Sequence, residues 1–370
     1  MSTLDLKKVC KNYGDLEAVK NLSFHCDDGQ FLAILGPSGA GKTSTLRMIA
    51  GLEKITSGEI LIDGRLINDI PVEQRNIAMA FERYVLYPHL TVFENIAFPL
   101  NVPIRKGKFK KSEIEKKVKT LTEFLEIDEF LDRNVTQLSG GQRQRVAFAR
   151  AMIRDADVFL FDEPLAHLDA KLRNRLRGEL KKMFSEERKT VIFVTHDFRE
   201  ATSMAEMILI LDHGETRQFG SPDEIYHHPT DMVVADMVGD PPMNFLDCGI
   251  NRKNGKIFIS VDGLQLDLPE YRAKKLQSLN SIHEKLVLGI RPIYAHITDG
   301  DDQDSVLRGE VFVLEPAGTK QILTLLIGET RFKVVVDVFF KADIGERVSL
   351  KVDMDHIVLF KKETQEALTL

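Results

Sequence analysis

The chain has 370 residues, of which 43% are hydrophobic and 29% charged, and a formal net charge of -6 at pH 7. This length exceeds what one hydrophobic core usually supports, so at least two domains are expected in a globular rather than disordered chain. The acidic balance argues against a nucleic-acid-binding protein, which would carry a basic domain or stripe.

Cysteine usage and hydropathy predict a cytosolic chain. Cys10, Cys26 and Cys248 are odd in number and lack metal-ligand spacing, so we expect reduced thiols that serve as packing residues. The amino terminus lacks the basic and then apolar run of a signal peptide, and no apolar stretch approaches the roughly 20 residues that cross a bilayer. Any membrane contact is therefore expected to go through a partner.

The first elements predict a small antiparallel subdomain and a strand, loop and helix. Short strands are expected at Leu4 to Val9 and at Asn21 to Cys26, and Glu59 to Asp63 fits one strand of a hairpin. The apolar run Gln30 to Leu35 leads into a glycine-rich loop, and the helix-compatible segment Thr43 to Ala50 follows it.

The middle of the chain predicts an α/β fold. Residues from about Glu94 to Met152 are mostly helical in pattern, which places a helical subdomain at about 88–155. Two later apolar runs, Val158 to Phe161 and Val191 to Thr195, each end in charged residues. Near-continuous apolar strands with charged residues at their carboxyl ends are typical of a parallel sheet covered on both faces.

A domain boundary is expected near Gly239 to Pro242. Beyond it, helix-like sequence gives way to short β-rich runs punctuated by Gly and Asp, among them Lys256 to Val261, Leu286 to Ile290 and Val311 to Leu314. The sequence thus predicts a first domain at 1–240 and a separate small β domain at 241–370.

The glycine-rich loop has the Gly-x4-Gly-Lys-Ser/Thr pattern of a phosphate-binding loop. Its glycines let backbone N–H groups cradle phosphate oxygens at a helix amino terminus, Lys42 reaches the β and γ phosphates, and the Thr43 hydroxyl can ligate Mg2+. A tight turn without a ligand is the alternative, which the flanking strand and helix disfavour. The predicted ATP-binding residues of this loop are Gly36, Pro37, Ser38, Gly39, Ala40, Gly41, Lys42, Thr43 and Ser44.

An acidic pair follows the run Val158 to Phe161. Asp162 is placed to hold the hydration shell of Mg2+, and Glu163 to polarise the attacking water as a catalytic residue. The alternative is a helix cap before Pro164.

A second motif, Leu138-Ser139-Gly140-Gly141-Gln142, lies downstream of the phosphate loop, and the two together resemble the ATP-binding cassette (ABC) ATPases. In that family this signature segment of one subunit closes over ATP held by the phosphate loop of another. Glycines and Ser139 at an expected helix start offer N–H groups, a hydroxyl and a positive dipole end to the γ phosphate. The resemblance implies a P-loop (RecA-like) parallel sheet core with antiparallel β and helical subdomains.

The resemblance assigns roles to further positions. His196, in Val-Thr-His-Asp, resembles the switch histidine that contacts the γ phosphate, and is predicted to be catalytic together with Glu163 and Lys42. Asp169 ends a D-loop, Leu165 to Asp169, and should reach across a dimer toward the partner's phosphate loop, although Ala166 and His167 replace the usual Ser-Asn pair. Tyr13 stands where an aromatic stacks on adenine, with a core tyrosine as the alternative.

One position departs from the family pattern. The segment Met79 to Tyr84 resembles the Q-loop, which links the Mg2+ site to the membrane subunits, but its glutamine is replaced by Glu82. A carboxylate keeps an oxygen for Mg2+, so Glu82 is predicted as a metal ligand with Thr43 and Asp162. Two unit charges about 5 Å apart repel by roughly 3 kcal/mol at an effective dielectric of 20 unless Mg2+ or a proton compensates. Slower hydrolysis is one interpretation, and a metal ligand without penalty is the favoured one.

Nearly the whole chain resembles the ATPase subunits of carbohydrate importers of the maltose-transporter type. The segments Tyr87 to Leu100 and Pro241 to Leu246 carry this likeness. Leu288 to Pro292 and Glu315 to Gly318 resemble an all-β, oligonucleotide-binding-like (TOBE) regulatory domain, although Ile293 stands where an acidic residue is usual.

This resemblance implies an ATPase that couples ATP binding and hydrolysis in a subunit dimer to uptake of a sugar or oligosaccharide. ATP is then the substrate and Mg2+ the cofactor. The implied partners are a second ATPase subunit, identical or unlike, two integral-membrane permease subunits and, indirectly, an extracytoplasmic solute-binding protein. The chain would lie peripherally at the cytoplasmic face of the membrane, with Val85, Leu86 and Tyr87 as the permease contact or, alternatively, as core packing.

Other functions are not excluded by the sequence. The importer could take up glycerol, glycerol phosphate or a polyamine, because the cassette does not contact the solute. A soluble ABC ATPase that acts on nucleic acid or ribosomes is disfavoured by 17 basic against 19 acidic residues from residue 241 onward. A non-catalytic regulatory partner in a heterodimer, with Glu82 marking a weakened site, is the third alternative.

Overall fold

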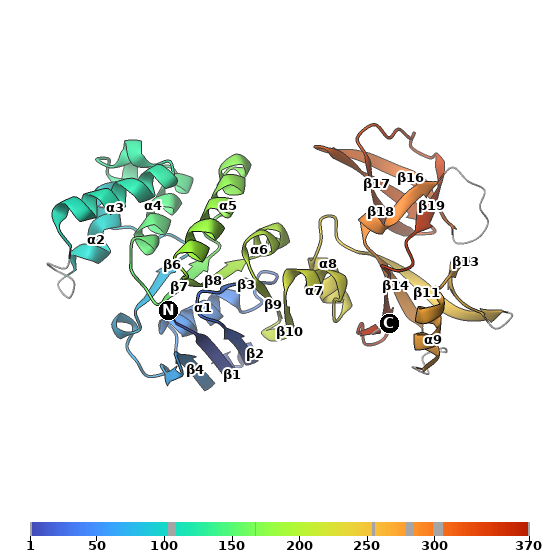
Figure 1. The fold of residues 1–370 in the computed structure, drawn as a ribbon, viewed down its shortest axis with the longest axis horizontal. Coiled ribbons are helices and arrows are strands. Elements are labelled where there is room, and N and C mark those ends of the chain that lie inside the picture. The colour runs from blue at the N-terminus through green and yellow to red at the C-terminus, as the bar shows by residue number, and fades with distance from the viewer. Residues whose placement is uncertain are drawn as a thin grey trace. The chain divides into compact units, whose positions relative to one another are not determined.

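The computed structural model describes residues 2–102, 109–166, 168–253, 256–278, 285–298 and 306–368. It divides into two compact units, Met1–Pro222 and Asp223–Leu370, which are described separately (Figure 1). The helices of the first unit are α1 (Lys42–Ala50), α2 (Val92–Asn101), α3 (Lys111–Phe124), α4 (Gly140–Met152), α5 (Ala170–Glu186) and α6 (Phe198–Met204). Its strands are β1 (Leu4–Tyr13), β2 (Leu16–Cys26), β3 (Phe31–Leu35), β4 (Ser57–Ile62), β5 (Arg65–Leu66), β6 (Ile77–Ala80), β7 (Val158–Asp162), β8 (Thr190–Thr195), β9 (Met207–Asp212) and β10 (Glu215–Gly220).

A 6-stranded sheet in the order β10-β9-β3-β8-β7-β6 forms the centre of the first unit. The pairs β9–β3, β3–β8, β8–β7 and β7–β6 are parallel, and only β10 joins this sheet antiparallel. Every residue of β3, β7 and β8 is buried, because apolar side chains project from both faces. The predicted α/β fold with a parallel sheet is confirmed.

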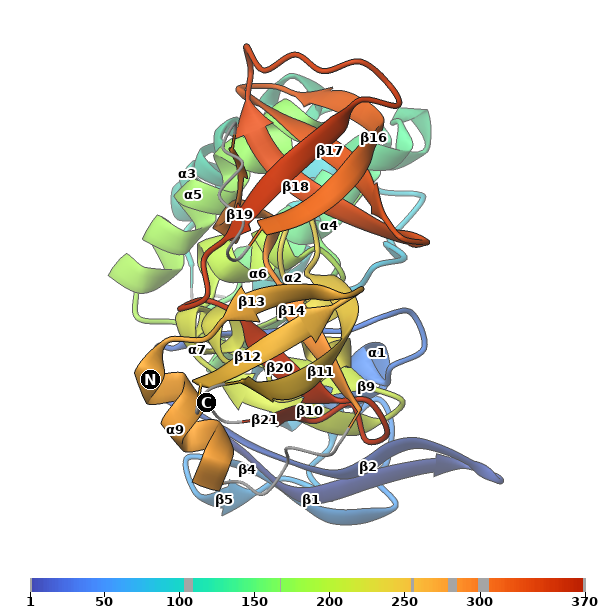
Figure 2. The ribbon, with the colours of Figure 1, turned by 90° about the vertical axis from the view of Figure 1, so that its right-hand side faces the viewer.

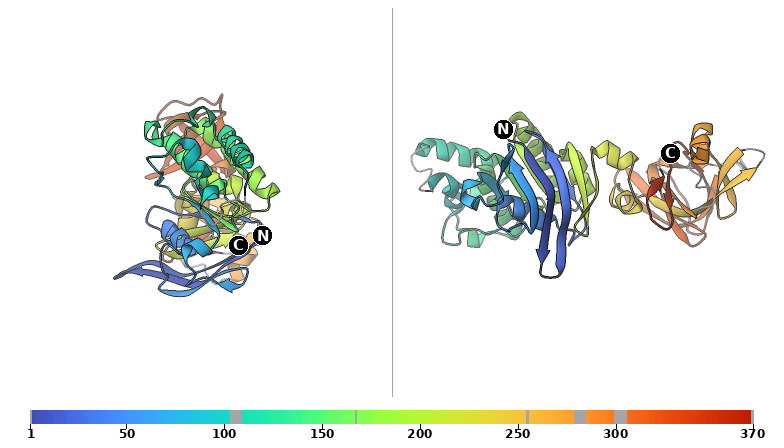
Figure 3. Two further views of the ribbon diagram at one scale, coloured as in Figure 1. Left: turned by 90° about the vertical axis from the view of Figure 1, so that its left-hand side faces the viewer. Right: turned by 90° about the horizontal axis from the view of Figure 1, so that it is seen from below.

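Helix α1 lies between the central sheet and the predicted antiparallel sheet, whose order is β2-β1-β4-β5. Its Leu46 and Ile49 belong to one buried cluster with Ile34 and Leu160 of the central sheet and Leu22 of β2. The right-hand view of Figure 3 shows the long β1–β2 hairpin of this second layer. The phosphate loop therefore precedes a helix that is held on two sides.

Aromatic packing covers the opposite face of the central sheet. Phe184 of α5 lies 5.4 Å from Phe159 and 5.5 Å from Phe161, and Phe148 of α4 lies 4.9 Å from Phe161, measured between ring centroids. Helices α2, α3 and α4 group together at one side of the unit, as predicted for the helical subdomain (Figure 1).

Gly178 lies in the exposed part of α5, and a Cβ built there meets nothing within 4 Å. Glycine in a helix interior loses more backbone entropy on folding than alanine does. We therefore expect Gly178→Ala to raise the free energy of unfolding by about 0.5–1 kcal/mol, measured by urea denaturation. A lower stability of this variant would show that α5 tolerates no side chain at this position.

The second unit contains α7 (Pro222–His227), α8 (Met232–Met237) and α9 (Glu270–Ser278). Its strands are β11 (Asn244–Lys253), β12 (Lys256–Val261), β13 (Leu264–Asp267), β14 (Leu286–Ile290), β15 (Ala295–Thr298), β16 (Val306–Ala317), β17 (Lys320–Ile327), β18 (Thr330–Asp337), β19 (Arg347–Val352), β20 (Val358–Lys361) and β21 (Ala367–Leu368). They form two sheets, β13-β12-β11-β14-β20-β21 and β15-β19-β16-β17-β18, which Figure 2 shows facing the viewer. One buried cluster, including Leu288, Leu323 and Phe332, joins the two sheets.

Helix α8 precedes the expected boundary at residue 240 but packs with the second unit. Ala235 contributes to a buried cluster with Met243, Val287 and Phe360, and the amide of Met232 donates to the carbonyl of Gln365. The β-rich part itself begins at Asn244 in β11, close to the expected boundary. Helix α9 lies within this part and was not predicted.

The cysteines are all free thiols. Cys26 lies in the core of the first unit, and burial raises the pKa of the Cys26 and Cys248 thiols to about 12. Both are therefore protonated at neutral pH and unreactive. Across the described ranges, no helix is long and apolar enough to cross a membrane.

Candidate functional site

The predicted site residues gather at the carboxyl ends of adjacent parallel strands. The phosphate loop follows β3, His196 follows β8, Asp162 ends β7 and Glu82 follows β6. Because β3, β8, β7 and β6 are neighbours in this order, these groups share one edge of the sheet. Open α/β sheets bind ligands at this edge.

The phosphate loop requires glycine at two positions for steric reasons. A Cβ at Gly36 would lie 2.1 Å from the carbonyl oxygen of Leu211 in β9, and a Cβ at Gly41 would lie 2.5 Å from that of Ala18 in β2. Gly41 also adopts a φ of 100° as it begins α1. The loop backbone therefore packs closely against β9 and β2. The amides of the loop lie at the amino end of α1.

Lys42 is buried at the base of this loop. Its Nζ donates to the carbonyls of Gly36 and Pro37, at 2.8 Å each. Burial lowers the pKa of Lys42, while Glu163, Asp162 and Glu82 raise it in that order. The ammonium group therefore lies in the electrostatic field of three carboxylates.

The carboxylate of Asp162 lies beside the hydroxyl of Thr43, which donates to Asp162 Oδ1 at 3.2 Å. Burial raises the pKa of Asp162 to about 6; the Thr43 hydrogen bond opposes this rise, and the charges of Glu82 and Glu163 add to it. A buried carboxylate with these neighbours favours a cation, and one carboxylate with a hydroxyl is a donor set that suits Mg2+ completed by phosphate oxygens and water. Among the described residues, no three His, Cys, Asp or Glu side chains converge into a complete metal site. The residues present fit Mg2+ bound together with a nucleotide.

Glu163 is held by four hydrogen-bonding contacts. Its carboxylate Oε2 lies 2.9 Å from Nδ1 of His196, and its amide donates to the carbonyl of Val194 at 3.0 Å. Its carbonyl accepts from Nε2 of Gln144 at 3.2 Å and from the amide of Ala166 at 3.3 Å. Its φ of 45° is uncommon for a residue other than glycine and costs of order 1 kcal/mol or more. Such strain is typical of functional sites. The next helix, α5, is capped by Asp169 and not by Glu163.

The signature segment forms the start of α4. The hydroxyl of Ser139 accepts from the amide of Gln142 at 3.3 Å, and the side chain of Gln142 accepts from the amide of Ser139 at 2.8 Å. This reciprocal capping box fixes the amino end of the helix, as the sequence predicts. Leu138 is buried beneath it.

Asp169 caps α5 in its own chain, because its Oδ1 accepts from the amide of Leu172 at 2.9 Å. That hydrogen bond lowers the pKa of Asp169. His167 of the same D-loop lies outside the described residues. A reach across a dimer stays a prediction.

Sequence reasoning missed two residues that hold the D-loop. Arg173 of α5 donates to the carbonyls of Leu165, Ala166 and Leu168. Its Nε also lies 3.8 Å from Glu200, a buried carboxylate that accepts from the hydroxyl of Thr195 at 2.7 Å. Arg173 and Glu200 thus connect the D-loop to the residue before His196. The only sequence signal for these contacts was the position of Arg173, four residues after Asp169.

Tyr13, Val85 and Tyr87 lie at the surface rather than in the core, whereas Leu86 is partly buried. Tyr13 is 41% exposed, with the ammonium of Lys11 4.6 Å from its ring centroid. Val85 is 69% exposed, and Tyr87 packs at the surface on Phe98.

Two arginines of α4 contact the segment around Val85. Arg150 donates to the Val85 carbonyl, and Arg143 donates to the Tyr84 hydroxyl. The Q-loop segment therefore contacts the helix that carries the signature.

Comparisons with known proteins agree with this site. Residues 19–166 match the ABC transporter family model, and residues 239–292 match the MalK OB fold domain. An uncharacterized ABC transporter ATP-binding protein, YurJ of Bacillus subtilis, is 42% identical over 370 residues, covering 100% of both chains. The trehalose/maltose import ATP-binding protein MalK of Thermococcus litoralis is 39% identical over 380 residues, again covering 100% of both.

A solved structure is also similar. The dimeric structure of the bacterial ABC transporter cassette MJ0796 superposes with a TM-score of 0.55 at 35% identity, covering 59% of this chain and 98% of that one. The chain belongs to the family of ATP-binding subunits of ABC transporters. It is an ABC ATPase, with ATP as its nucleotide.

Proposed function

We propose that the chain is the ATP-hydrolysing subunit of an importer for a sugar or oligosaccharide. The observation that carries this proposal is the likeness over the full length to a trehalose/maltose import protein, which includes the second unit as well as the ATPase. An ATPase unit alone would not favour any class of transported solute.

The geometry supports a division of roles at the nucleotide. Lys42 and the loop amides Gly39 to Lys42 bind the phosphates at the amino end of α1. Thr43 and Asp162 hold Mg2+, which neutralises charge on the phosphates when bound, and Glu82 adds a carboxylate to the same field.

Glu163 then orients and polarises the attacking water. His196, 2.9 Å from its carboxylate, positions that carboxylate and contacts the γ phosphate. Tyr13 is exposed at the end of β1 and available to stack on adenine. These assignments follow the chemistry of phosphoryl transfer, in which positioning and electrostatics dominate.

Two such subunits complete each other's sites. The signature helix start at Ser139 carries its free amides and positive dipole end to ATP on the phosphate loop of a second ATPase subunit. The exposed residues Val85, Tyr87 and Phe98 form an apolar surface next to the Q-loop, which suits two membrane-embedded permease subunits. The chain would then act at the cytoplasmic face of the membrane, without contact with the solute.

Purification of the chain from native membranes tests this function. Co-purifying permease subunits, and ATP turnover stimulated by a solute-binding protein loaded with one sugar in proteoliposomes, are the expected results. Turnover that responds to nucleic acid or ribosomes and not to a loaded binding protein would contradict the proposal. Stimulation by glycerol phosphate or a polyamine alone would keep the importer but change its solute.

Glu82→Gln tests whether the substituted Q-loop residue is a metal ligand. Loss of one carboxylate weakens the attraction for Mg2+, so we expect about three- to tenfold more Mg2+ for half-maximal ATP turnover, with the maximal rate changed less than about threefold. Glu73→Gln, which neutralises an exposed carboxylate elsewhere, is the matched control. A tenfold faster maximal rate in Glu82→Gln would instead identify Glu82 as a brake on hydrolysis.

A further inference from the structure

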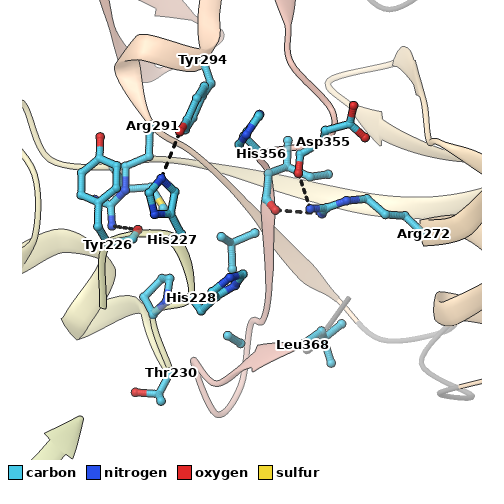
Figure 4. A pocket seen from close by; sticks show the side chains of 15 residues that line it. Tyr226, His227, His228, Thr230, Arg272, Arg291, Tyr294, Asp355, His356 and Leu368 are labelled. Carbon is cyan, nitrogen blue, oxygen red and sulfur yellow. Dashed lines mark hydrogen bonds between the residues drawn. The ribbon is translucent and has the colours of Figure 1, made fainter. Parts of the chain in front are cut away.

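The second unit encloses a cavity of about 490 Å³ that is separate from the nucleotide site. All of its lining residues lie between Tyr226 and Leu368. They come from residues 226–230 and 355–358, from Arg291 and Tyr294, from Ala367 and Leu368, and from Met243 and Arg272, and Figure 4 shows their side chains around the cavity. Cavities of this volume are in the range that holds small organic molecules. Nothing in the proposed ATPase mechanism uses it.

Two buried arginines line the cavity, and their hydrogen bonds go to neutral oxygens. Arg291 is 2% exposed and donates to the carbonyls of Ala235, Val238 and Tyr226. Arg272 is 9% exposed and donates to the carbonyls of Ile357 and Asp355 and to the hydroxyl of Tyr271.

Neither arginine forms a direct ion pair with a described acidic side chain. Within the described ranges, no carboxylate lies within 4 Å of either guanidinium group. The carboxylate of Asp355, which also lines the cavity, accepts from the Tyr271 hydroxyl at 2.9 Å and is turned away from Arg272 in Figure 4. The same hydroxyl accepts from Nε of Arg272, so the Asp355 carboxylate is linked to this arginine through Tyr271 rather than directly. Two buried positive charges beside one concavity raise the electrostatic potential inside it.

Among the described residues, the guanidinium group of Arg291 has neither a full set of hydrogen bonds nor a nearby negative charge. Its Nε is buried and has no hydrogen-bond partner. Burial lowers the pKa of Arg291 to about 10, and the nearby groups that oppose this are the phenols of Tyr226 and Tyr294 rather than carboxylates. A buried cation without a counter-charge is costly, and an anion bound nearby would offset that cost.

The rest of the wall suits an organic molecule. His227 lies 3.3 Å from the hydroxyl of Tyr294, and the ring of His356 stacks on Tyr294 at 4.2 Å. Met243 and Leu368 supply apolar surface. Although imidazoles are present, in the part of the chain that the structure describes no three such groups converge on a metal position.

We propose that this cavity binds a small organic anion, with its phosphate or carboxylate group attracted to Arg272 and Arg291 and its body held between the imidazole, phenol and apolar walls. The cavity would make the second unit a sensor of an intracellular metabolite of about the size of a monosaccharide phosphate. The proposal does not depend on which solute the transporter carries.

The test uses the full chain with Lys42→Ala, so that binding of phosphate groups at the phosphate loop does not interfere. Glucose 6-phosphate, gluconate, inorganic phosphate and neutral glucose are titrated by isothermal titration calorimetry. Histidine-ring nitrogen NMR follows His227, His228 and His356. At least one of the two organic anions is expected to bind saturably and to shift these ring signals, whereas glucose is not.

Three variants locate the binding. Arg272→Met removes one charge and Ala367→Phe fills the cavity without changing any charge, and both are expected to weaken binding about tenfold or more. Arg331→Gln removes an exposed positive charge that lies outside the cavity and is expected to change binding less than about twofold. Thermal melting of each variant confirms that it is folded, and Ala367→Phe decides the matter if Arg272→Met is unstable.

The same titrations identify the chemical class of the bound anion. Binding of glucose 6-phosphate alone assigns a phosphate ester, and binding of gluconate alone assigns a carboxylate. No saturable binding of either organic anion up to about 10 mM overturns the proposal, as does binding that Ala367→Phe leaves unchanged. Inorganic phosphate bound as tightly as glucose 6-phosphate would also overturn it, because the walls would then recognise no organic body.

Discussion

Replacing Glu163 with glutamine is expected to reduce ATP turnover by about 10²–10⁴-fold while ATP binding persists. A glutamine amide keeps the shape of the side chain and its contact with His196 but cannot polarise the attacking water. It also removes one of the negative charges that act on Lys42, so the affinity for the triphosphate is not expected to fall. Turnover is measured with saturating Mg2+ and ATP, and binding with a fluorescent nucleotide.

Glu179→Gln is the matched control for this substitution, since it neutralises an exposed carboxylate of α5. Its turnover is expected to equal that of the unmodified chain. If Glu163→Gln turned over ATP as fast as the unmodified chain, Glu163 would not be the catalytic carboxylate. If the unmodified chain were as inactive as Glu163→Gln in the presence of its permease, the alternative of a non-catalytic regulatory partner would gain support.

Asp162→Asn is expected to stabilise the nucleotide-free protein while it abolishes ATP turnover supported by Mg2+. Asp162 is 2% exposed, and its pKa rises from 3.8 to about 6 in the folded chain. A raised carboxylate pKa means that folding favours the protonated form, so stability falls as the pH rises from about 3.8 through 6. The full penalty, at most about 3 kcal/mol, is present at neutral pH.

The neutral amide of Asp162→Asn removes this penalty. We expect it to raise the free energy of unfolding by about 1–3 kcal/mol at pH 7.5 and by about half as much at pH 5. Chemical denaturation at the two pH values measures the difference, with Asp132→Asn at an exposed position as the control. A gain of equal size at both pH values would mean that ionisation of Asp162 is not its cause.

The elements of the central sheet could be predicted because burial on both faces dictates their sequence. The runs Val158 to Phe161 and Val191 to Thr195 correspond to β7 and β8. The charged residues that follow both runs lie at the same edge of the sheet, where the parallel strands end. The phosphate loop was equally predictable, since side chains at Gly36 and Gly41 would collide with the backbone of neighbouring strands and only glycine fits there. Local chemistry determined these features.

The features that the sequence did not predict depend on contacts between residues that are far apart in the chain. The contacts from Arg173 to three D-loop carbonyls and to Glu200 join segments whose proximity only the folded sheet creates. Helix α9 has nine residues and buries little besides Arg272 and Leu276, so its periodicity was too short to recognise. The arginine-lined cavity was not predicted for a similar reason, because its walls come from several segments spread over residues 226–368.

Several independent contacts anchor Glu163. The amide is anchored to β8, the carbonyl to α4 and to the amide of Ala166, and the carboxylate to the loop after β8, so no single contact is the sole anchor of this residue. A substitution at His196 alone is therefore expected to free the carboxylate of Glu163 while its backbone stays anchored to β8 and α4.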